Sequence, residues 1–245
     1  MLHGSKRILL FDDAGQIKKI QNLFGSSLIG YWPGAEAGAS PLPSALDYSG
    51  RSFHGAYTGV TLGQPGIGDG LTCPLYNGST SFMQPPAGFR TAFTSAEYSF
   101  LLWFWPFNVG VWTDAAARVM IRVLVDANNT ANIQKSSTNN TLQWQDIAGA
   151  TVKTVTLATQ SFLVPNHLGL TVSRSADQMK AYFNGAQTGA TQTGLGTWVG
   201  IPIAANTLVG AGSTTPTFIT NGYVAHAIVL NRAATPAEVA AAALL

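Results

Sequence analysis

The segment Asp47–Gly55, which reads DYSGRSFHG, brings together residue types used in acid–base and nucleophilic chemistry. It contains a carboxylate at Asp47, a hydroxyl at Ser49 and an imidazole at His54. A Ser-His-Asp triad is assembled in space, so sequence spacing alone does not exclude one. The chain has no G-x-S-x-G segment, however, of the kind that presents a nucleophilic serine on a strained turn. The segment is therefore either a site or a polar turn, and the elements around it decide between the two.

The other titratable residues give little support to hydrolytic or zinc chemistry. Glycoside hydrolases place two carboxyl groups about 5–10 Å apart, whereas the 11 Asp and Glu residues here are scattered without an E-x-D-x-E pattern. His54, His167 and His226 have no histidine partner at i+4 and no neighbouring cysteine, which argues against a zinc site. The glycine-rich run Gly63–Gly70 lacks the Lys-Thr of a phosphate loop and is predicted to be a surface loop.

Carbohydrate recognition would need exposed aromatic rings with amide or carboxylate groups beside them. Asn108 and Asn128 supply amides that are close in sequence to such rings. The aromatic candidates at predicted loops and strand ends are Trp112, Trp198, Tyr57 and Tyr76. Each of these rings can equally pack in a core or at a sheet edge, because aromatic side chains carry a large apolar surface.

Composition excludes several broad classes of protein. The 13 basic and 11 acidic residues give a net charge of +2 without a basic stripe, so nucleic acid is not an expected partner. Cys73 is the single cysteine, so an internal disulfide is impossible. The apolar run ILLF near the N-terminus is followed at once by two aspartates. We therefore expect no signal peptide, no membrane insertion and synthesis in the cytoplasm.

Short alternating runs separated by turn residues predict an all-β protein. We expect a two-sheet antiparallel jelly-roll sandwich over residues 27–245, because strands with one apolar face need a second sheet to cover them. Residues 1–26 are predicted to form an N-terminal arm for anchoring or assembly, in which RILLF and QIKKI pair as a hairpin around DDAG. At the other end, TPAEVAAAALL predicts a short helix with Thr235 as N-cap and Glu238 completing a capping box.

Five short motifs follow one another between residues 28 and 242. They are LIGYW (Leu28–Trp32), the D-x-S-G turn at Asp47, YSFLLWFWP (Tyr98–Pro106), His167–Thr171 with MKAYFNG, and GYVAHAIVLNRAATPAE. In this order they resemble the motifs of laminin-G-like or concanavalin-A-like lectin and glucanase jelly-roll domains of the bacterial and phage type. The resemblance implies two packed antiparallel sheets and a mostly non-catalytic domain that binds glycans or other proteins.

The resemblance also implies calcium near the D-x-S-G turn, but one expected ligand is missing. The closing segment of the family carries an acidic pair, which is Ala225-His226 in this chain. Calcium takes about 6–8 oxygen ligands, with carboxylates among them, so Asp47 with backbone carbonyls would make only a weak site. We expect no resident cofactor, and Asp47 is the calcium candidate.

Two predicted strands are apolar on both faces, although the outward face of a sheet is normally polar. In YVAHAIVL, alternation places His226 on one face with Val224, Ile228 and Leu230. The outer surface must be covered by the N-terminal hairpin, the C-terminal helix or a neighbouring subunit. We hypothesise that part of it is an oligomer or assembly contact, with the candidate residues Leu101, Trp103, Trp105, Val224, His226, Ile228 and Leu230.

Together these features predict a non-catalytic recognition or structural subunit of a larger assembly. The expectation is a phage virion surface protein, either a decoration or a fibre component, which forms homo-oligomers or binds other virion proteins. Its jelly roll would be displayed outward and could bind cell-surface glycans. Two alternatives stay open, namely a glycan-binding adhesin module of a bacterial surface protein and a glycoside hydrolase of the jelly-roll glucanase type.

Overall fold

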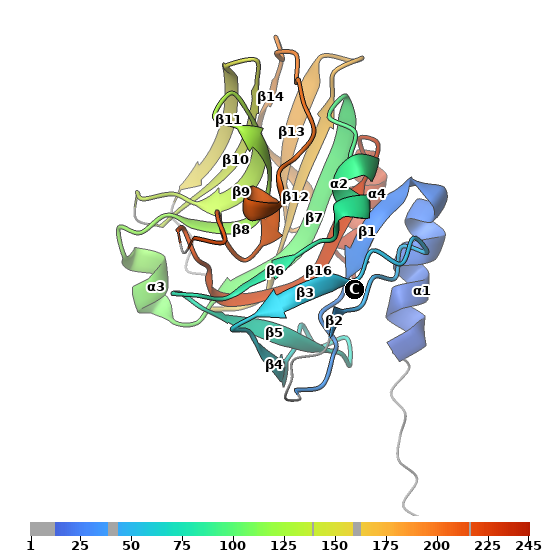
Figure 1. Ribbon diagram of the computed structural model, residues 1–245, viewed down its shortest axis with the longest axis vertical. Helices are drawn as coiled ribbons and strands as arrows, with labels where there is room; N and C mark the ends of the chain where they lie inside the picture. Colours follow the sequence, from blue (N-terminus) through green and yellow to red (C-terminus); the bar gives the residue numbers. More distant parts are fainter. Residues whose placement is uncertain (1–12, 39–43, 139, 159–162, 216) are drawn as a thin grey trace, which may run out of the picture.

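The computed structural model describes residues 13–38, 44–138, 140–158, 163–215 and 217–245. Its strands form two antiparallel sheets that pack face to face (Figure 1), as expected for an all-β sandwich. Helices are few and short among the described residues. They are α1 (Asp13–Phe24), η1 (Gly25–Ser27), α2 (Ala87–Ala92), α3 (Val109–Thr113), η2 (Ala204–Asn206) and α4 (Pro236–Ala242). None of these helices is both long and apolar enough to cross a membrane.

Within the described residues, each sheet contains eight strands. The order in sheet A is β14 (Ala186–Gln192), β13 (Gln178–Phe183), β12 (Asn166–Ser173), β7 (Glu97–Pro106), β16 (Asn221–Leu230), β5 (Thr72–Asn77) and β4 (Thr61–Pro65), and β1 (Leu28–Trp32) also pairs with β16. The order in sheet B is β11 (Thr151–Ala158), β10 (Thr141–Ala148), β9 (Asn129–Lys135), β8 (Arg118–Asp126), β15 (Leu208–Val209), β6 (Phe82–Gln84), β3 (Gly55–Thr58) and β2 (Ser44–Ala45). Neighbours far apart in sequence, such as β7 and β16, create the crossovers of a jelly roll.

The main core lies between the two sheets. Alternation along β7 directs Phe100, Leu102 and Phe104 inward, where all three are almost completely buried. The facing residues from sheet B include Ile133 and Trp144, which are fully buried. This confirms the expectation that each one-sided apolar strand is covered by the opposite sheet.

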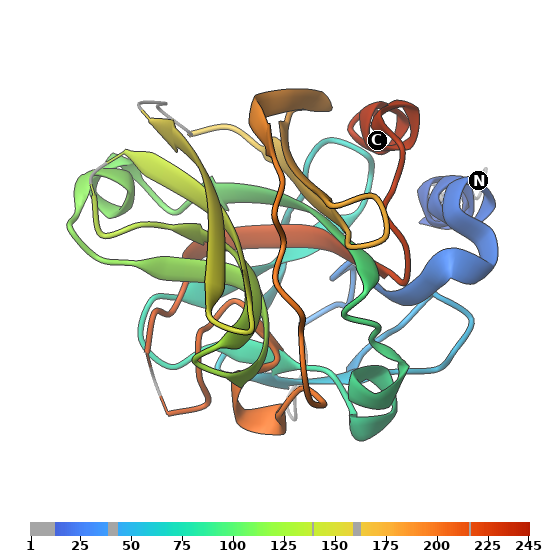
Figure 2. The ribbon, with the colours of Figure 1, turned by 90° about the horizontal axis from the view of Figure 1, so that it is seen from above.

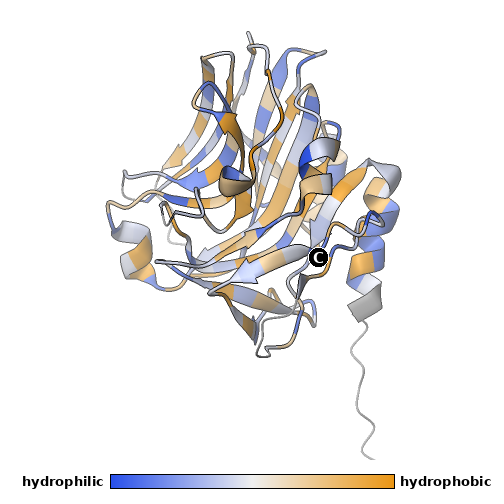
Figure 3. Ribbon diagram, in the orientation of Figure 1, coloured by the Kyte–Doolittle hydropathy of each residue, from blue (hydrophilic) through white to orange (hydrophobic). Residues whose placement is uncertain are grey.

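Helix α1 replaces part of the predicted N-terminal hairpin. The stretch QIKKI, which we expected to be a strand, lies within this helix, whereas RILLF lies outside the described residues. Ile17, Ile20 and Phe24 are buried on one face, and Figure 3 shows the alternation of polar and apolar positions along α1. The spacing i, i+3, i+7 is that of an amphipathic helix, so the strand predicted here from the DDAG turn signal was wrong.

Helix α4 forms as the sequence predicts. The hydroxyl of Thr235 accepts a hydrogen bond from the Glu238 amide at 3.2 Å, and the Glu238 carboxylate accepts one from the Thr235 amide at 2.8 Å. Pro236 occupies the first turn, where its missing N–H costs nothing. Figure 2 shows α1 and α4 side by side on one flank of the sandwich.

Helices α1 and α4 cover part of the outer face of sheet A. Leu101, Ile228 and Leu230 from this face form one buried cluster with residues of both helices, including Ile20 and Val239. Three of the residues that we assigned to an assembly contact are therefore covered by the chain itself. The covering helix α1 is the element that the sequence analysis had expected as a hairpin.

A bulge in β16 changes which residues share a face. The pairing with β7 shifts between Ala225 and Ile228, and His226 has a φ of +49°. The extra residue turns Val224 toward the inner core, whereas Ile228 faces outward. The prediction that Val224, His226, Ile228 and Leu230 lie on one face was wrong, because a bulge reverses the alternation beyond it.

Candidate functional site

The D-x-S-G turn is a structural element rather than a site. Asp47 Oδ1 accepts hydrogen bonds from the amides of Tyr31 and Ser49, both at 2.9 Å. Asp47 Oδ2 accepts from the Ser49 hydroxyl at 2.7 Å and from the Phe53 amide at 2.8 Å. The bond to Ser49 is the Asx turn typical of such sequences. His54 also serves the turn, because its Nδ1 accepts a hydrogen bond from the Asp47 amide at 3.0 Å.

The calcium hypothesis finds no support at this turn. Asp47 is only 7% exposed and both of its carboxylate oxygens are engaged by protein donors. The described residues hold no group of three or more His, Cys, Asp or Glu that could bind a metal ion. Asp47 thus holds β1 to the segment that leads into β3.

Three of the four aromatic residues proposed as sugar platforms are buried. Trp112 and Tyr76 are 1% exposed and Trp198 is 7% exposed, so none of them can present a ring face to a ligand. Tyr57 is half-buried and donates its hydroxyl to Glu36 at 3.0 Å. The sequence placed these rings near strand ends, but it did not show that their side chains point into the core.

A buried hydrogen-bonded chain joins three segments that the sequence did not bring together. His226 Nε2 lies 2.8 Å from Asp69 Oδ2, and His226 Nδ1 lies 3.0 Å from the Tyr31 hydroxyl. Burial raises the pKa of Asp69, but the hydrogen bond and charge of His226 lower it more, so it stays below its usual value. All three side chains are almost fully buried, so no substrate can reach them. The chain ties the glycine-rich loop around Asp69 to β16 and β1.

The remaining part of the outer face of sheet A carries an aromatic patch, formed by Trp103, Trp105 and Tyr223. The rings of Trp105 and Tyr223 stack with centroids 4.8 Å apart, and Trp103 meets the edge of His167 at 5.5 Å. Ile67 packs against this patch. Trp103 and Tyr223 are half-buried, so of the predicted assembly residues only Trp103 keeps a clearly accessible surface.

The outer face of sheet B carries a row of polar residues along β8, β9 and β10, which the outer face of sheet A lacks. We define the polar face by the residues Arg122, Thr130, Asn132, Gln134, Gln143 and Gln145 from β8, β9 and β10. These positions alternate with core residues such as Ile133 and Trp144, so they point away from the sandwich. Cross-strand register places Arg122 beside Asn132 and Asn132 beside Gln145.

The amides of the polar face hydrogen-bond to one another across the strands. Asn132 Nδ2 donates to Gln145 Oε1 at 3.3 Å, and Gln134 Nε2 donates to Gln143 Oε1 at 3.1 Å. Asn132 is 4% exposed, and its Oδ1 has no hydrogen-bond partner. The row therefore contains a buried, unsatisfied acceptor next to Arg122.

Arg122 is the only charged member of the polar face. Its Nε donates to the Thr130 hydroxyl at 3.4 Å and its Nη1 donates to the Gly212 carbonyl at 3.1 Å. No carboxylate of the described residues pairs with it. Burial lowers the pKa of the Arg122 guanidinium, because its charge is partly removed from water without a counterion.

Phe218 stands next to Arg122 in a strained conformation. Its side chain is 51% exposed and its φ is +54°, a region that bulky residues rarely adopt. A Cβ atom added to Gly212 would lie 2.9 Å from Phe218 Cδ2 and 3.3 Å from Arg122 Nη1. Both side chains thus flank Gly212, which must stay small to accommodate them.

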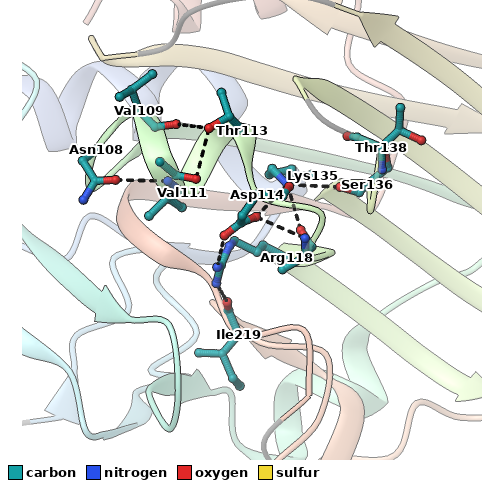
Figure 4. Close-up of polar contacts among 12 residues, drawn as sticks. Asn108, Val109, Val111, Thr113, Asp114, Arg118, Lys135, Ser136, Thr138 and Ile219 are labelled. Carbon is teal, nitrogen blue, oxygen red and sulfur yellow. Dashed lines mark hydrogen bonds and ion pairs between the residues drawn. The ribbon is translucent and has the colours of Figure 1, made fainter.

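A network of charged groups holds the segment that carries Phe218 (Figure 4). The fully buried Lys135 Nζ donates to the Asp114 carbonyl at 2.6 Å and to its carboxylate at 3.0 Å. Asp114 also pairs with Arg118, whose Nη1 donates to the Ile219 carbonyl at 3.0 Å. Burial raises the pKa of Asp114, but hydrogen bonds from Arg118 and Lys135 lower it more, so this carboxylate is held ionised. In addition, the Val119 amide donates to the Phe218 carbonyl at 2.8 Å.

This arrangement is suited to binding hydroxyl-rich ligands. Amide side chains both donate and accept hydrogen bonds, an exposed aromatic ring can cover an apolar ligand face, and Arg122 offers a cation. The sequence analysis missed these residues, although the alternating Asn and Gln in NTANIQK and TLQWQ give a signal for a polar outward face. Nothing in the sequence around Phe218 indicated that its ring would be exposed beside this face.

Comparisons with known proteins identify the fold. No family model and no curated protein sequence matches the chain. Domain 4 of AbnA, a GH43 extracellular arabinanase from Geobacillus stearothermophilus in complex with arabinotriose, is similar with a TM-score of 0.60 and 18% identity, over 89% of this chain and 98% of that one. The botulinum neurotoxin type G receptor binding domain has a TM-score of 0.58 and 14% identity over 88% of this chain and 50% of that one.

Trypanosoma rangeli sialidase, in complex with the inhibitor DANA, has a TM-score of 0.62 and 13% identity over 89% of this chain. This chain spans only 32% of the sialidase and about half of the neurotoxin domain. At such low identity these likenesses establish the fold alone. The chain folds as a jelly-roll-like β-sandwich.

Proposed function

We propose that this protein is a non-catalytic recognition module that binds carbohydrate through the polar face of sheet B. The observation that carries the proposal is the exposed ring of Phe218, held at a φ of +54° beside Arg122 and the cross-strand amides. Strain of this kind costs about 1–3 kcal/mol and persists where the surrounding structure imposes it, which is common at binding sites.

The chemistry of the face supports a sugar ligand. A sugar offers hydroxyl groups around an apolar ring face, and both find partners here. Gln134, Gln143 and Gln145 are half-buried and lie on adjacent strands, so their amides can meet successive hydroxyl groups along an extended chain. The arabinotriose complex of the similar AbnA domain agrees with such a role for the fold.

The way the carboxylates are used supports a non-catalytic role. Asp146 is fully buried and accepts hydrogen bonds from Arg174 at 2.8 and 2.9 Å and from the Tyr98 hydroxyl at 2.6 Å. Asp47, Asp69, Asp114 and Glu238 are likewise occupied by protein donors. Hydrolysis of a glycosidic bond needs two available carboxyl groups, and none of these is free to take part.

A glycan array with the wild-type protein and two variants tests the proposal. Phe218→Ala removes the exposed ring of the polar face, whereas Phe107→Ala removes a ring of similar exposure, 52%, at the end of β7. We expect binding by the wild-type protein and by Phe107→Ala, and a loss of roughly tenfold or more in affinity for Phe218→Ala. Equal loss in both variants, or no binding by the wild-type protein, would argue against the proposal.

A second candidate function is that of a subunit in a virion surface layer, made in the host cytoplasm, as a decoration or fibre component. The aromatic patch favours it, because Trp103 and Tyr223 remain half-buried on a face that α1 and α4 leave open. Attachment through sheet A would leave the polar face of sheet B directed outward. Sedimentation at micromolar concentration tests this candidate: we expect an oligomer that Trp103→Glu dissociates, and a wild-type monomer would count heavily against it.

A further inference from the structure

We infer that the polar face recognises an acidic saccharide, with the carboxylate of the sugar bound by Arg122. The inference rests on the proposed function and adds the chemical class of the ligand. The evidence for an acidic ligand is the arrangement of charged groups around Arg122. Binding of a neutral carbohydrate would not require this arrangement.

The missing counterion of Arg122 is the first argument. Arg118, Arg174 and Arg232 each pair with a carboxylate of the chain, namely Asp114, Asp146 and Glu238. Arg51, Arg90 and Arg122 donate to neutral oxygens instead. Arg122 has only a hydroxyl and a backbone carbonyl as partners. Partly buried charges are normally paired, because removing an ion from water is costly. An anionic ligand would supply the missing partner.

The geometry of the guanidinium is the second argument. The bonds from Nε to Thr130 and from Nη1 to Gly212 fix the orientation of the group. They leave N–H donors on Nη1 and Nη2 without a partner among the described residues. Such a fork matches the two oxygens of a carboxylate. Because two of its bonds are already made within the protein, the fork is held in place before the ligand arrives.

The neighbours of Arg122 are the third argument. Asn132, which pairs with it across the strands, is neutral, and the half-buried Gln145 beside Asn132 can accept a hydrogen bond from a ligand hydroxyl. Phe218 flanks the other side of the guanidinium across Gly212. The other members of the polar face are amides and a hydroxyl, so none of them repels an anion. A sugar ring can thus lie between Phe218 and the amides with its carboxylate on Arg122.

Matched ligand pairs that differ in the carboxylate test this inference. Titration calorimetry would compare polygalacturonate with its methyl ester, and 3′-sialyllactose with lactose. We expect the acidic member of at least one pair to bind about tenfold or more tightly, with an affinity that falls as salt screens the charge. Equal affinity within each pair would overturn the acidic-ligand inference and leave the carbohydrate proposal standing. No binding by any member would overturn both.

Variants test whether Arg122 is the residue that binds the carboxylate of the ligand. Arg122→Gln should abolish the preference for the acidic ligand, whereas Lys180→Gln, which makes the same change in net charge on β13 of sheet A, should preserve it. Arg122→Lys keeps the charge without the fork, and we expect an intermediate preference. If Arg122→Gln fails to fold, Arg122→Lys and the wild-type pairs still decide the matter. Equal preference in wild type and both Arg122 variants would overturn the assignment.

Discussion

Phe218 combines an exposed aromatic ring with a backbone conformation that favours glycine. If the strain serves binding, removing it should benefit stability and cost affinity. We predict that Phe218→Gly is more stable than Phe218→Ala by about 1 kcal/mol, since only alanine retains the Cβ strain at positive φ. Chemical denaturation measures this difference. Equal stability of the two variants would show that the conformation carries no strain.

His167 gives a separate prediction at the residue scale. Burial, with a smaller effect of the His226 charge, lowers the pKa of His167 to about 3. The unfolded chain, with a histidine pKa near 6.5, therefore binds a proton that the folded protein excludes between about pH 3 and 6.5. The free energy of unfolding should fall as the pH falls through this window, by up to about 1.4 kcal/mol per pH unit from this group.

The variant His167→Phe removes this titration and keeps a ring beside Trp103. Denaturant titrations between pH 4 and 6.5 should show a shallower dependence of stability on pH than the wild-type protein. Asp69 and Asp114, whose pKa values are lowered, add a dependence of the same sign at lower pH, so some slope remains. An unchanged slope between pH 4 and 6.5 would contradict the prediction.

At the scale of elements, α1 is part of the sandwich rather than a detachable arm. Ile20 is 1% exposed and packs in the cluster that covers the outer face of sheet A. We predict that Ile20→Ala lowers the free energy of unfolding by about 2–4 kcal/mol. Lys18→Ala, on the exposed side of the same helix, should change it by less than about 0.5 kcal/mol. A small effect of Ile20→Ala, measured by denaturation, would show that α1 is only loosely attached.

The loop around Asp69 gives a second prediction at this scale. Asp69→Ala would leave the buried Nε2 of His226 without its partner, and unsatisfied buried groups of this kind cost about 1–3 kcal/mol. Asp69→Asn keeps an acceptor oxygen and should cost less. Thermal unfolding of both variants checks this order. If both substitutions were neutral, the bond between Asp69 and His226 would not hold the loop.

Elements with a strong local pattern could be predicted from the sequence, whereas elements that depend on tertiary context could not. The strands of the core follow from alternation, and α4 follows from Thr235, Pro236 and Glu238. Helix α1 was missed because DDAG was interpreted as a hairpin turn, although Ile17 and Ile20 in QIKKI have the i, i+3 spacing of a helix. The bulge at His226 has no sequence signal, yet it reverses the facing of Val224.

The candidate site was predicted less well than the fold. Three of the four aromatic residues chosen from the sequence have their side chains in the core. Whether a ring is buried depends on the face of the sheet on which it lies, and the sequence near strand ends did not show this face. The site proposed here depends on register between β8, β9 and β10, which sets Arg122 beside Asn132 and Gln145. It also depends on Phe218. This residue lies about one hundred residues after Arg122 in the sequence, and long-range contacts through Gly212 bring the two together.

The whole molecule has two dissimilar outer surfaces. Sheet A is covered by α1 and α4 and otherwise shows the aromatic patch, whereas sheet B shows the polar face. This asymmetry agrees with a module that is attached on one side and binds its ligand on the other. The proposal of attachment through sheet A and that of carbohydrate binding through sheet B can be tested independently, because their residues do not overlap.

Nuclear magnetic resonance of the labelled protein, titrated with a carbohydrate that it binds, tests the central claim most directly. The account predicts shifts in the side-chain amides of Gln134, Gln143 and Gln145, in Arg122 Nε and in the backbone around Phe218. The indole signals of Trp103 and Trp105, on the opposite sheet, should stay unchanged. Shifts confined to these indoles, with the amides of the polar face unperturbed, would contradict the account.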